Sequence, residues 1–270
     1  MLEKLDEIKK IIFEAEAILI TAGAGIGVDS GLPDFRGKEG FWKAYPMASK
    51  LNLEFEELAN PKWFYTNPSM AWAFYGHRYD LYKKTTPHDG FKMLLDLVKS
   101  KNNNYFVFTS NVDGQFQKAG FDSDKIIECH GSISHFQCLY NCSKNIWEKN
   151  EEFDIDINIL VSKTLPRCPH CNEIARPNIL MFGVFNWNGR RTSEQEERYT
   201  EWKRANKGKK ILIIELGAGT AISTVRRESE NIAKYYCGKL IRINPRDFEV
   251  DERYGYSLPF GALEGLKCIL

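Results

Sequence analysis

The sequence has no excess of charge of either sign, no long apolar run and no internal repeat. Among its 270 residues, 37 lysines and arginines face 36 aspartates and glutamates, which leaves a net charge of +1. This balance gives no reason to expect nucleic acid or an anionic membrane as a partner. No apolar run approaches the roughly 20 residues of a membrane span, and the first residues lack the pattern of a signal peptide. We therefore expect neither nucleic-acid nor membrane partners.

Cysteine is limited to seven residues, and without a secretory pattern they indicate a reducing, cytoplasmic location. Four of them form two close pairs, Cys138/Cys142 and Cys168/Cys171. Four thiolates can close a tetrahedral, structural zinc site. The second pair has two intervening residues, the standard spacing of a zinc knuckle, whereas the first has three. The alternative is a group of reduced thiols that bind no metal.

Apolar runs that alternate with helical stretches predict the fold class. Strands are expected near residues 17, 106, 126, 211 and 240, after an amphipathic helix that opens the chain, and a further helix is expected over about 90–99. This order predicts an α/β protein with a doubly wound, Rossmann-like parallel sheet. The segment 132–178 interrupts the alternation and holds both cysteine pairs, so we expect it to be a small zinc-binding domain. The large domain then comprises 1–131 and 179–270, with a module of short, proline-broken helices at about 38–82.

A glycine-rich loop follows the first expected strand. Five glycines lie between Gly23 and Gly37, and they allow sharp turns and a close approach to phosphate. The spacing fits the Gly-x-Gly-x-x-Gly fingerprint of dehydrogenases poorly, because the glycine after Gly27 is Gly31. The lysine and Ser/Thr of a P-loop are also missing. The loop therefore indicates a nucleotide site that serves neither hydride transfer nor hydrolysis of a nucleoside triphosphate.

The complete loop resembles the cofactor-binding loop of the sirtuin family, the NAD-dependent protein deacylases. Further segments resemble the motifs of that family in the same order along the chain, from residue 17 to residue 244. They are Thr109-Ser110-Asn111-Val112-Asp113-Gly114, Glu128-Cys129-His130-Gly131, the two cysteine pairs, Arg176 to Gly183, Gly217-Ala218-Gly219-Thr220 and Asn244.

The resemblance implies NAD as the co-substrate and Zn2+ as the structural metal. It places NAD on a set of loop residues: Gly23, Ala24, Gly25, Asp34, Phe35, Arg36, Ser110, Asn111, Val112, Asp113, His130, Gly217, Gly219, Thr220 and Asn244. In sirtuins the acyl-lysine oxygen attacks ribose C1′ as nicotinamide leaves, and a histidine then deprotonates a ribose hydroxyl. The resemblance assigns that general base to His130, whose ordinary pKa suits the task. It makes Asn111 the second catalytic residue, which positions ribose or a water.

The acyl-lysine protein is implied to contact Phe182 and Gly183. A Tyr-x-x-Arg pair, Tyr75 and Arg78, matches the pair of sirtuins that remove succinyl or malonyl groups, because tyrosine and a fixed cation can bind a carboxylate. A helix whose arginine faces solvent or an internal acid is the alternative for this pair.

Three positions depart from the standard deacylases: Gly27 replaces a serine, Ser110 a glutamine and Val184 a glutamate. Together with the distorted segment at Gly217, these features resemble the macrodomain-linked sirtuins of bacteria, which transfer ADP-ribose to an acceptor protein. Three hypotheses follow, namely a lysine deacylase that forms O-acyl-ADP-ribose, a protein ADP-ribosyltransferase and a non-enzymatic NAD sensor. The presence of His130 favours the deacylase.

Overall fold

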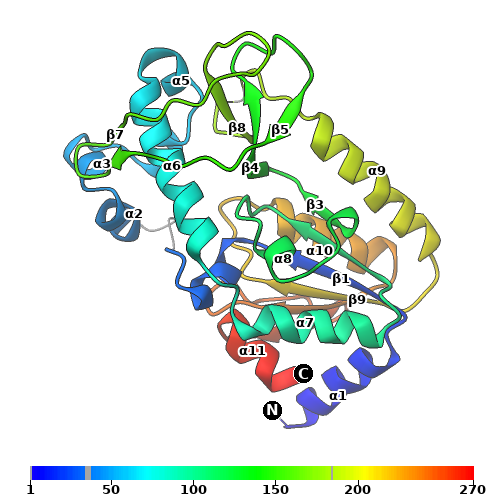
Figure 1. Cartoon of the computed structure of the whole chain (residues 1–270). Helices are drawn as coiled ribbons and strands as arrows, with labels where there is room; N and C mark the ends of the chain where they lie inside the picture. Colours follow the sequence, from blue (N-terminus) through cyan, green and yellow to red (C-terminus); the bar gives the residue numbers. More distant parts are fainter. Residues whose placement is uncertain (1, 34–37, 184) are drawn as a thin grey trace.

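The computed structural model describes residues 2–33, 38–183 and 185–270. It contains a large parallel sheet between two helical layers, and a smaller antiparallel sheet lies beyond one edge of the large one (Figure 1). The cyan helix α6 (Pro68–Lys84) runs between these two regions. Within the described parts of the chain, every helix is too short or too polar to traverse a bilayer.

The large sheet has six strands in the order β11-β10-β9-β1-β2-β3, and every neighbouring pair is parallel. All residues of the two central strands are buried, because apolar runs fill them and helices cover both faces. The five strands expected from the sequence are confirmed, and β11 is an additional edge strand. The strands are β1 (Ala17–Ala22), β2 (Tyr105–Thr109), β3 (Ile126–Glu128), β9 (Ile211–Leu216), β10 (Lys239–Ile243) and β11 (Gly255–Leu258).

Helices cover both faces of this sheet, which is the doubly wound arrangement that the sequence predicts. One face packs against α1 (Leu2–Glu14), α7 (Asp89–Ser100), α8 (Gln115–Lys118) and α11 (Ala262–Ile269). The other face packs against α9 (Arg190–Ala205) and α10 (Thr224–Tyr235). Two short 3-10 helices, η1 (Ala24–Ser30) and η2 (Ser123–Lys125), complete this part of the chain.

The segment that interrupts the alternation forms a second sheet. Its three antiparallel strands have the order β5-β4-β8, with bounds β4 (Gly131–Cys138), β5 (Ile146–Glu148) and β8 (Ala175–Ile179). A two-stranded hairpin of β6 (Ile155–Asp156) and β7 (Val161–Ser162) contacts α6. The chain enters and leaves this region at one point, where Gly131 pairs with Ile179. A Cβ on Gly131 would fall 2.0 Å from the carbonyl oxygen of Asn178, so only glycine fits there.

The helical segment near 38–82 shares a hydrophobic core with the small sheet. Its helices are α2 (Lys38–Ala44), α3 (Pro46–Lys50), α4 (Phe55–Leu58), α5 (Lys62–Thr66) and α6. The first four are short, as expected, but α6 continues without a break because Pro68 stands at its first turn, where proline is tolerated. The indole of Trp72 in α6 donates to the carbonyl oxygen of Ala175 in β8 at 3.0 Å. The domain division at residues 131/132 and 178/179 stays a prediction.

Candidate functional site

The strand order creates a topological switch point between β1 and β9, at the carboxyl edge of the large sheet. From β1 the chain proceeds to β2 and β3 on one side, whereas β9 and β10 lie on the other side. The chain continues from β1 to helices on one face of the sheet and from β9 to α10 on the other face. Ligands of open α/β sheets bind in a crevice at such a switch point. The sequence places its nucleotide motifs on the loops after these two strands and on the loops after β2, β3 and β10.

The glycines of the first loop are required by contact with the loop after β9. The amide of Gly25 donates to the carbonyl oxygen of Gly217 at 3.1 Å. A Cβ on Gly25 would fall 2.7 Å from the Cα of Gly217, and one on Gly23 would fall 2.8 Å from the Cα of Ala218. Gly217 itself has a φ of +59°. The sequence predicts close approach to a phosphate here, and the structure adds that the two backbones approach each other closely.

Asn111 links the loop after β2 to the glycine-rich loop. Its buried side-chain amide donates to the carbonyl oxygen of Gly23 at 3.1 Å, and its backbone amide donates to Thr109 Oγ1 at 3.0 Å. The preceding amide, of Ser110, donates to the carbonyl oxygen of Ala22 at 3.2 Å. The structure therefore places the predicted residues of the first two loops side by side.

Asp113 and His130 are titratable groups on neighbouring loops, and burial shifts both of them toward the neutral form. Burial raises the pKa of Asp113 to about 6, and the charge of Glu128 acts in the same direction. Burial also lowers the pKa of His130, against the opposing effect of its hydrogen bond with the Ser110 backbone. A neutral imidazole at the carboxyl edge of the sheet is able to accept a proton near neutral pH.

The loops after β9 and β10 lie on the other side of the switch point. Gly217 and Gly219 are buried, whereas Thr220 is exposed. The side-chain amide of Asn244 donates to the carbonyl oxygen of Ala218 at 2.9 Å, so Asn244 braces this loop. The three predicted residues Asp34, Phe35 and Arg36 lie outside the described residues.

The segment after β8 brings Phe182 and Gly183 toward the same edge. The amide of Leu180 donates to the carbonyl oxygen of His130 at 2.9 Å, and the amide of Phe182 donates to that of Ala59 at 3.1 Å. Gly183 is exposed with a φ of +81°. The loop proposed to contact the acyl-lysine protein is thus tied directly to the residue proposed as the base.

Arg176 supports this loop through hydrogen bonds of its guanidinium, a role that the sequence motifs did not reveal. The side chain is fully buried, and it donates to the carbonyl oxygens of Ile179 at 2.7 Å and Phe185 at 2.9 Å. These carbonyls flank the segment that contains Phe182 and Gly183. Burial lowers the pKa of Arg176 to about 10. Arg176 is the first residue of the family-like segment Arg176 to Gly183, and this position is the signal in the sequence that could have identified it.

A second residue that the motifs did not reveal, Arg191 of α9, contacts the strand that leads to His130. Its guanidinium pairs with the buried carboxylate of Glu128, and Thr192 Oγ1 donates to the Glu128 carbonyl oxygen at 3.3 Å. A hollow of about 560 Å³ is lined by Arg191 together with Asp113. The two contacts join the start of α9 to the end of β3, next to the proposed base.

Tyr75 and Arg78 lie in the helical core. Tyr75 is 1% exposed and stacks on Phe64, with 5.7 Å between ring centroids. The guanidinium of Arg78 is 7% exposed, donates to the hydroxyl of Tyr82 and lies over aromatic rings that include Phe74. The charge of Arg78 also acts to lower the pKa of the buried Asp113, against the effect of burial.

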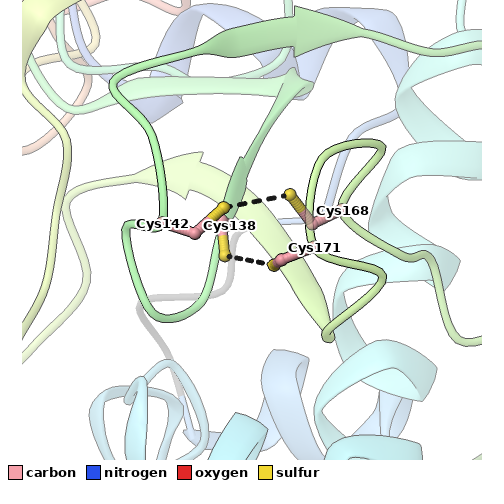
Figure 2. A group of neighbouring side chains, drawn as sticks. All are labelled: Cys138, Cys142, Cys168 and Cys171. Carbon is pink, nitrogen blue, oxygen red and sulfur yellow. Dashed lines mark hydrogen bonds between the residues drawn. The ribbon is translucent and has the colours of Figure 1, made fainter.

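The four paired cysteines converge on one point (Figure 2). Their sulfur atoms all lie within 4.8 Å of one another, with 3.6 Å between those of Cys138 and Cys171 and 3.5 Å between those of Cys142 and Cys168. Four sulfurs at 2.3 Å from a tetrahedral zinc ion stand about 3.8 Å apart, whereas a disulfide requires about 2.05 Å. The residues therefore fit a closed zinc site despite the three-residue spacing of the first pair.

Comparisons with known proteins agree with this architecture. The family model described as "Sir2 family" matches residues 23–201. A protein of Pyrococcus furiosus named NAD-dependent protein deacylase is 32% identical over 210 residues, which cover 78% of this chain and 75% of that protein. One of the same name from Thermus thermophilus is 28% identical over 273 residues, which cover 100% of this chain and 95% of that protein.

A solved structure described as a Sir2 homolog–NAD complex has the same fold. It superposes with a TM-score of 0.75 at 24% identity and covers 98% of this chain and 92% of that one. The family match spans the glycine-rich loop, the loops after β2 and β3, the four cysteines and the segment after β8. This chain therefore belongs to the Sir2 family.

Proposed function

We propose that this protein is an NAD-dependent protein deacylase, which removes an acyl group from lysine and transfers it to ADP-ribose. The observation that carries the proposal is the arrangement around His130. The backbone of Ser110, on the loop that also holds Asn111, raises the pKa of the His130 imidazole against the effect of burial. The carbonyl oxygen of His130 accepts from the amide of Leu180, in the segment that leads to Phe182. Transfer of an acyl group from lysine to ADP-ribose requires a base that lies between the proposed nucleotide site and the acceptor loop.

The proposed binding of NAD uses the residues of the crevice. The glycine-rich loop and the loop after β9 would hold the pyrophosphate, with Asn244 as the brace of the latter. Asp113 would accept hydrogen bonds from the nicotinamide amide, and Asn111 would position the ribose. When bound, NAD supplies an electrophilic ribose carbon with nicotinamide as the leaving group. The roles proposed for Asp34, Phe35 and Arg36 as a cover over the cofactor concern residues outside the described ranges.

Zinc has a structural role in this proposal. Cys138, Cys142, Cys168 and Cys171 would hold it with four thiolates, which leaves no open position for catalysis. The ion would join the turn after β4 to the turn before β8 and so stiffen the small sheet. Thiols arranged for a metal, at distances that exclude a disulfide, also support the proposal of a reducing, cytoplasmic location.

The acyl group is proposed to lie near Arg78. Its buried cation, with Tyr75 in the same core, would favour an acyl chain that ends in a carboxylate, because a charge in a nonpolar environment interacts strongly with an opposite one. A direct comparison of acetyl-lysine with succinyl-lysine and malonyl-lysine peptides tests this point. A preference for acetyl-lysine would show that Arg78 only stabilises the helical core and does not bind the acyl group.

The function is tested by incubating the protein with NAD and acyl-lysine peptides, and by mass spectrometry of the products. We expect nicotinamide and O-acyl-ADP-ribose in equal amounts. His130→Ala should lose turnover and retain NAD binding, since the imidazole is proposed to act after the cofactor is bound. Addition of ADP-ribose mass to an acceptor protein, without O-acyl-ADP-ribose, would instead establish the ADP-ribosyltransferase. Retained deacylation by His130→Ala would remove that residue from the mechanism.

A further inference from the structure

Three aromatic side chains from separate segments gather next to the acceptor loop. They are Tyr65 of α5, Tyr140 of the first cysteine knuckle and Phe185, and together we name them the aromatic platform. The ring centroid of Tyr65 lies 5.7 Å from that of Tyr140 and 5.7 Å from that of Phe185, both in edge-on geometry. Tyr140 is 55% exposed and Phe185 is 56% exposed. Large apolar groups that cluster at the surface mark interaction sites more often than isolated ones do.

The additional residue of the first cysteine pair accounts for the position of Tyr140. Three residues separate Cys138 from Cys142, and the last of them, Asn141, adopts a φ of +50° to complete the turn. Leu139 is buried, while Tyr140 points outward. The spacing that departs from the standard zinc knuckle therefore places an aromatic ring on the surface.

The aromatic platform is held in place before any partner binds. The hydroxyl of Tyr65 donates to the carbonyl oxygen of Leu139 at 3.1 Å and accepts from Nδ2 of Asn186 at 3.0 Å. The carbonyl oxygen of Phe185 accepts from Arg176 at 2.9 Å. Groups that are already ordered lose less conformational entropy on association, so this surface is suited to binding.

A hollow of about 590 Å³ adjoins the aromatic platform, and we name it the cationic hollow. Its charged lining side chains within the described residues are Lys144 and Arg190, and both are cations. Arg190 Nε forms an ion pair with Glu194 Oε1 at 2.9 Å, and Glu194 lies outside the lining. The indole Nε1 of Trp187, also in the lining, is buried without a hydrogen-bond partner among the described residues.

The cationic hollow is continuous with the aromatic platform. Asn141, which follows Tyr140 in the chain, belongs to its lining, and Asn141 Nδ2 donates to the carbonyl oxygen of Asn186 at 3.2 Å. Helix α9 begins at Arg190, so the positive end of its dipole faces this region. The charge of the hollow is therefore complementary to a carboxylate.

From this surface we infer the class of acceptor protein. We propose that the aromatic platform and the cationic hollow bind one extended segment of the acyl-lysine protein, with an apolar side chain on the platform and an aspartate or glutamate in the hollow. This rests on the proposed function, because Phe185 follows Gly183 by only two residues in the loop that contacts the acyl-lysine. An extended strand advances about 3.3 Å per residue, so adjoining sites can be filled by residues close in sequence.

The test compares three fluorescent acyl-lysine peptides of equal length. The first contains an apolar residue and Glu, the second has Gln in place of Glu, and the third has Ala in place of the apolar residue. Binding to the full-length protein is measured by fluorescence anisotropy, which does not depend on turnover. We expect Glu→Gln in the peptide to weaken binding by about fivefold, the size of an exposed ion pair. Replacement of the apolar residue should weaken binding by about tenfold, as is usual for a well-packed anchor.

Variants of the protein locate the two contacts. Tyr140→Ala should weaken the binding of both peptides that carry the apolar residue. Lys144→Glu should abolish the preference for the Glu peptide over the Gln peptide. Lys99→Glu on α7 and Phe13→Ala on α1, which change exposed side chains on distant helices, serve as matched controls. Thermal unfolding verifies that each variant is folded.

Unchanged affinities in Tyr140→Ala and Lys144→Glu would overturn the proposal. So would sedimentation that shows a second copy of this chain bound through Tyr140. NAD-dependent deacylation of an acyl-lysine without flanking residues should be the same in all variants, because this small substrate does not reach the aromatic platform or the cationic hollow. If no acyl-lysine is turned over at all but the peptide affinities change as expected, the proposed function fails and the docking surface stands.

Discussion

The buried guanidinium of Arg176 offers the sharpest test of how the acceptor loop is held. Replacing Arg176 with methionine removes its hydrogen bonds to the carbonyl oxygens of Ile179 and Phe185 and keeps a side chain of similar length. Hydrogen bonds to a charged group contribute about 1.5–3 kcal/mol each. The two bonds therefore stabilise the loop by about 3–6 kcal/mol.

Burial of the charge opposes this gain. It lowers the pKa of Arg176 from 12.5 to about 10, which corresponds to about 3 kcal/mol against the charged form in the folded state. Arg176→Met should thus reduce the free energy of unfolding by no more than about 3 kcal/mol. The acceptor loop, however, loses both of its hydrogen bonds to Arg176.

The assay separates the loop from the rest of the protein. At saturating NAD we expect kcat/KM for an acyl-lysine peptide to fall by about 100-fold, the equivalent of about 3 kcal/mol, while the Kd for NAD is unchanged. Arg167→Met is the matched control, because this exposed arginine makes one long hydrogen bond, of 3.5 Å, within the same region. Peptide kcat/KM within threefold of the unmodified protein, or an equal loss of NAD affinity, would refute the reasoning.

Three further predictions follow from the site. Burial raises the pKa of Asp113 from 3.8 to about 6, so the folded state loses stability as the pH rises through that range. Asp113→Asn should therefore increase the free energy of unfolding by about 2–3 kcal/mol at pH 8 and by little at pH 3. Urea unfolding at both pH values measures this, and an equal change at the two would contradict it. Burial lowers the pKa of His130 below 6.5, so His130 is neutral and able to act as a base above that pH. We therefore expect kcat/KM to fall with decreasing pH only below pH 6.5, and a fall that begins above pH 7 would contradict this role. Cys171→Ser should abolish zinc binding and lower the Tm, as measured by elemental analysis and thermal unfolding, whereas Cys237→Ser, at an exposed cysteine outside the cluster, should do neither.

The sequence predicts the large sheet well because its strands are apolar runs that are buried on both faces. The run 17–20 lies in β1 and the run 211–214 in β9, at the centre of the sheet. Strand β11 was not predicted, because Tyr256 and Ser257 are half-exposed at the edge and give no continuous apolar run. The length of α6 was also missed, since this helix is buried on most sides and shows no clear apolar stripe.

The crevice residues were predicted through motifs, because loops that follow parallel strands meet at one edge. Other contacts depend on the path of the backbone. The bond from Arg176 to the carbonyl oxygen of Phe185 joins positions nine residues apart through a loop that no periodicity describes. The same is true of Arg191 and Glu128, which are separated by 63 residues. Resemblance to a family indicates the candidate NAD-binding residues, whereas only the structure indicates what supports them.

The pairing of Gly131 with Ile179 determines which part of this chain can vary in length without moving His130. The whole excursion between them departs and returns through one narrow neck, which a side chain on Gly131 would force apart. Lengthening, shortening or rewriting the chain beyond the neck leaves the distance between His130 and Leu180 as it is. The segment that carries Tyr140 and Lys144 can therefore change in length or sequence while the pairing of Gly131 with Ile179, next to His130, stays as it is.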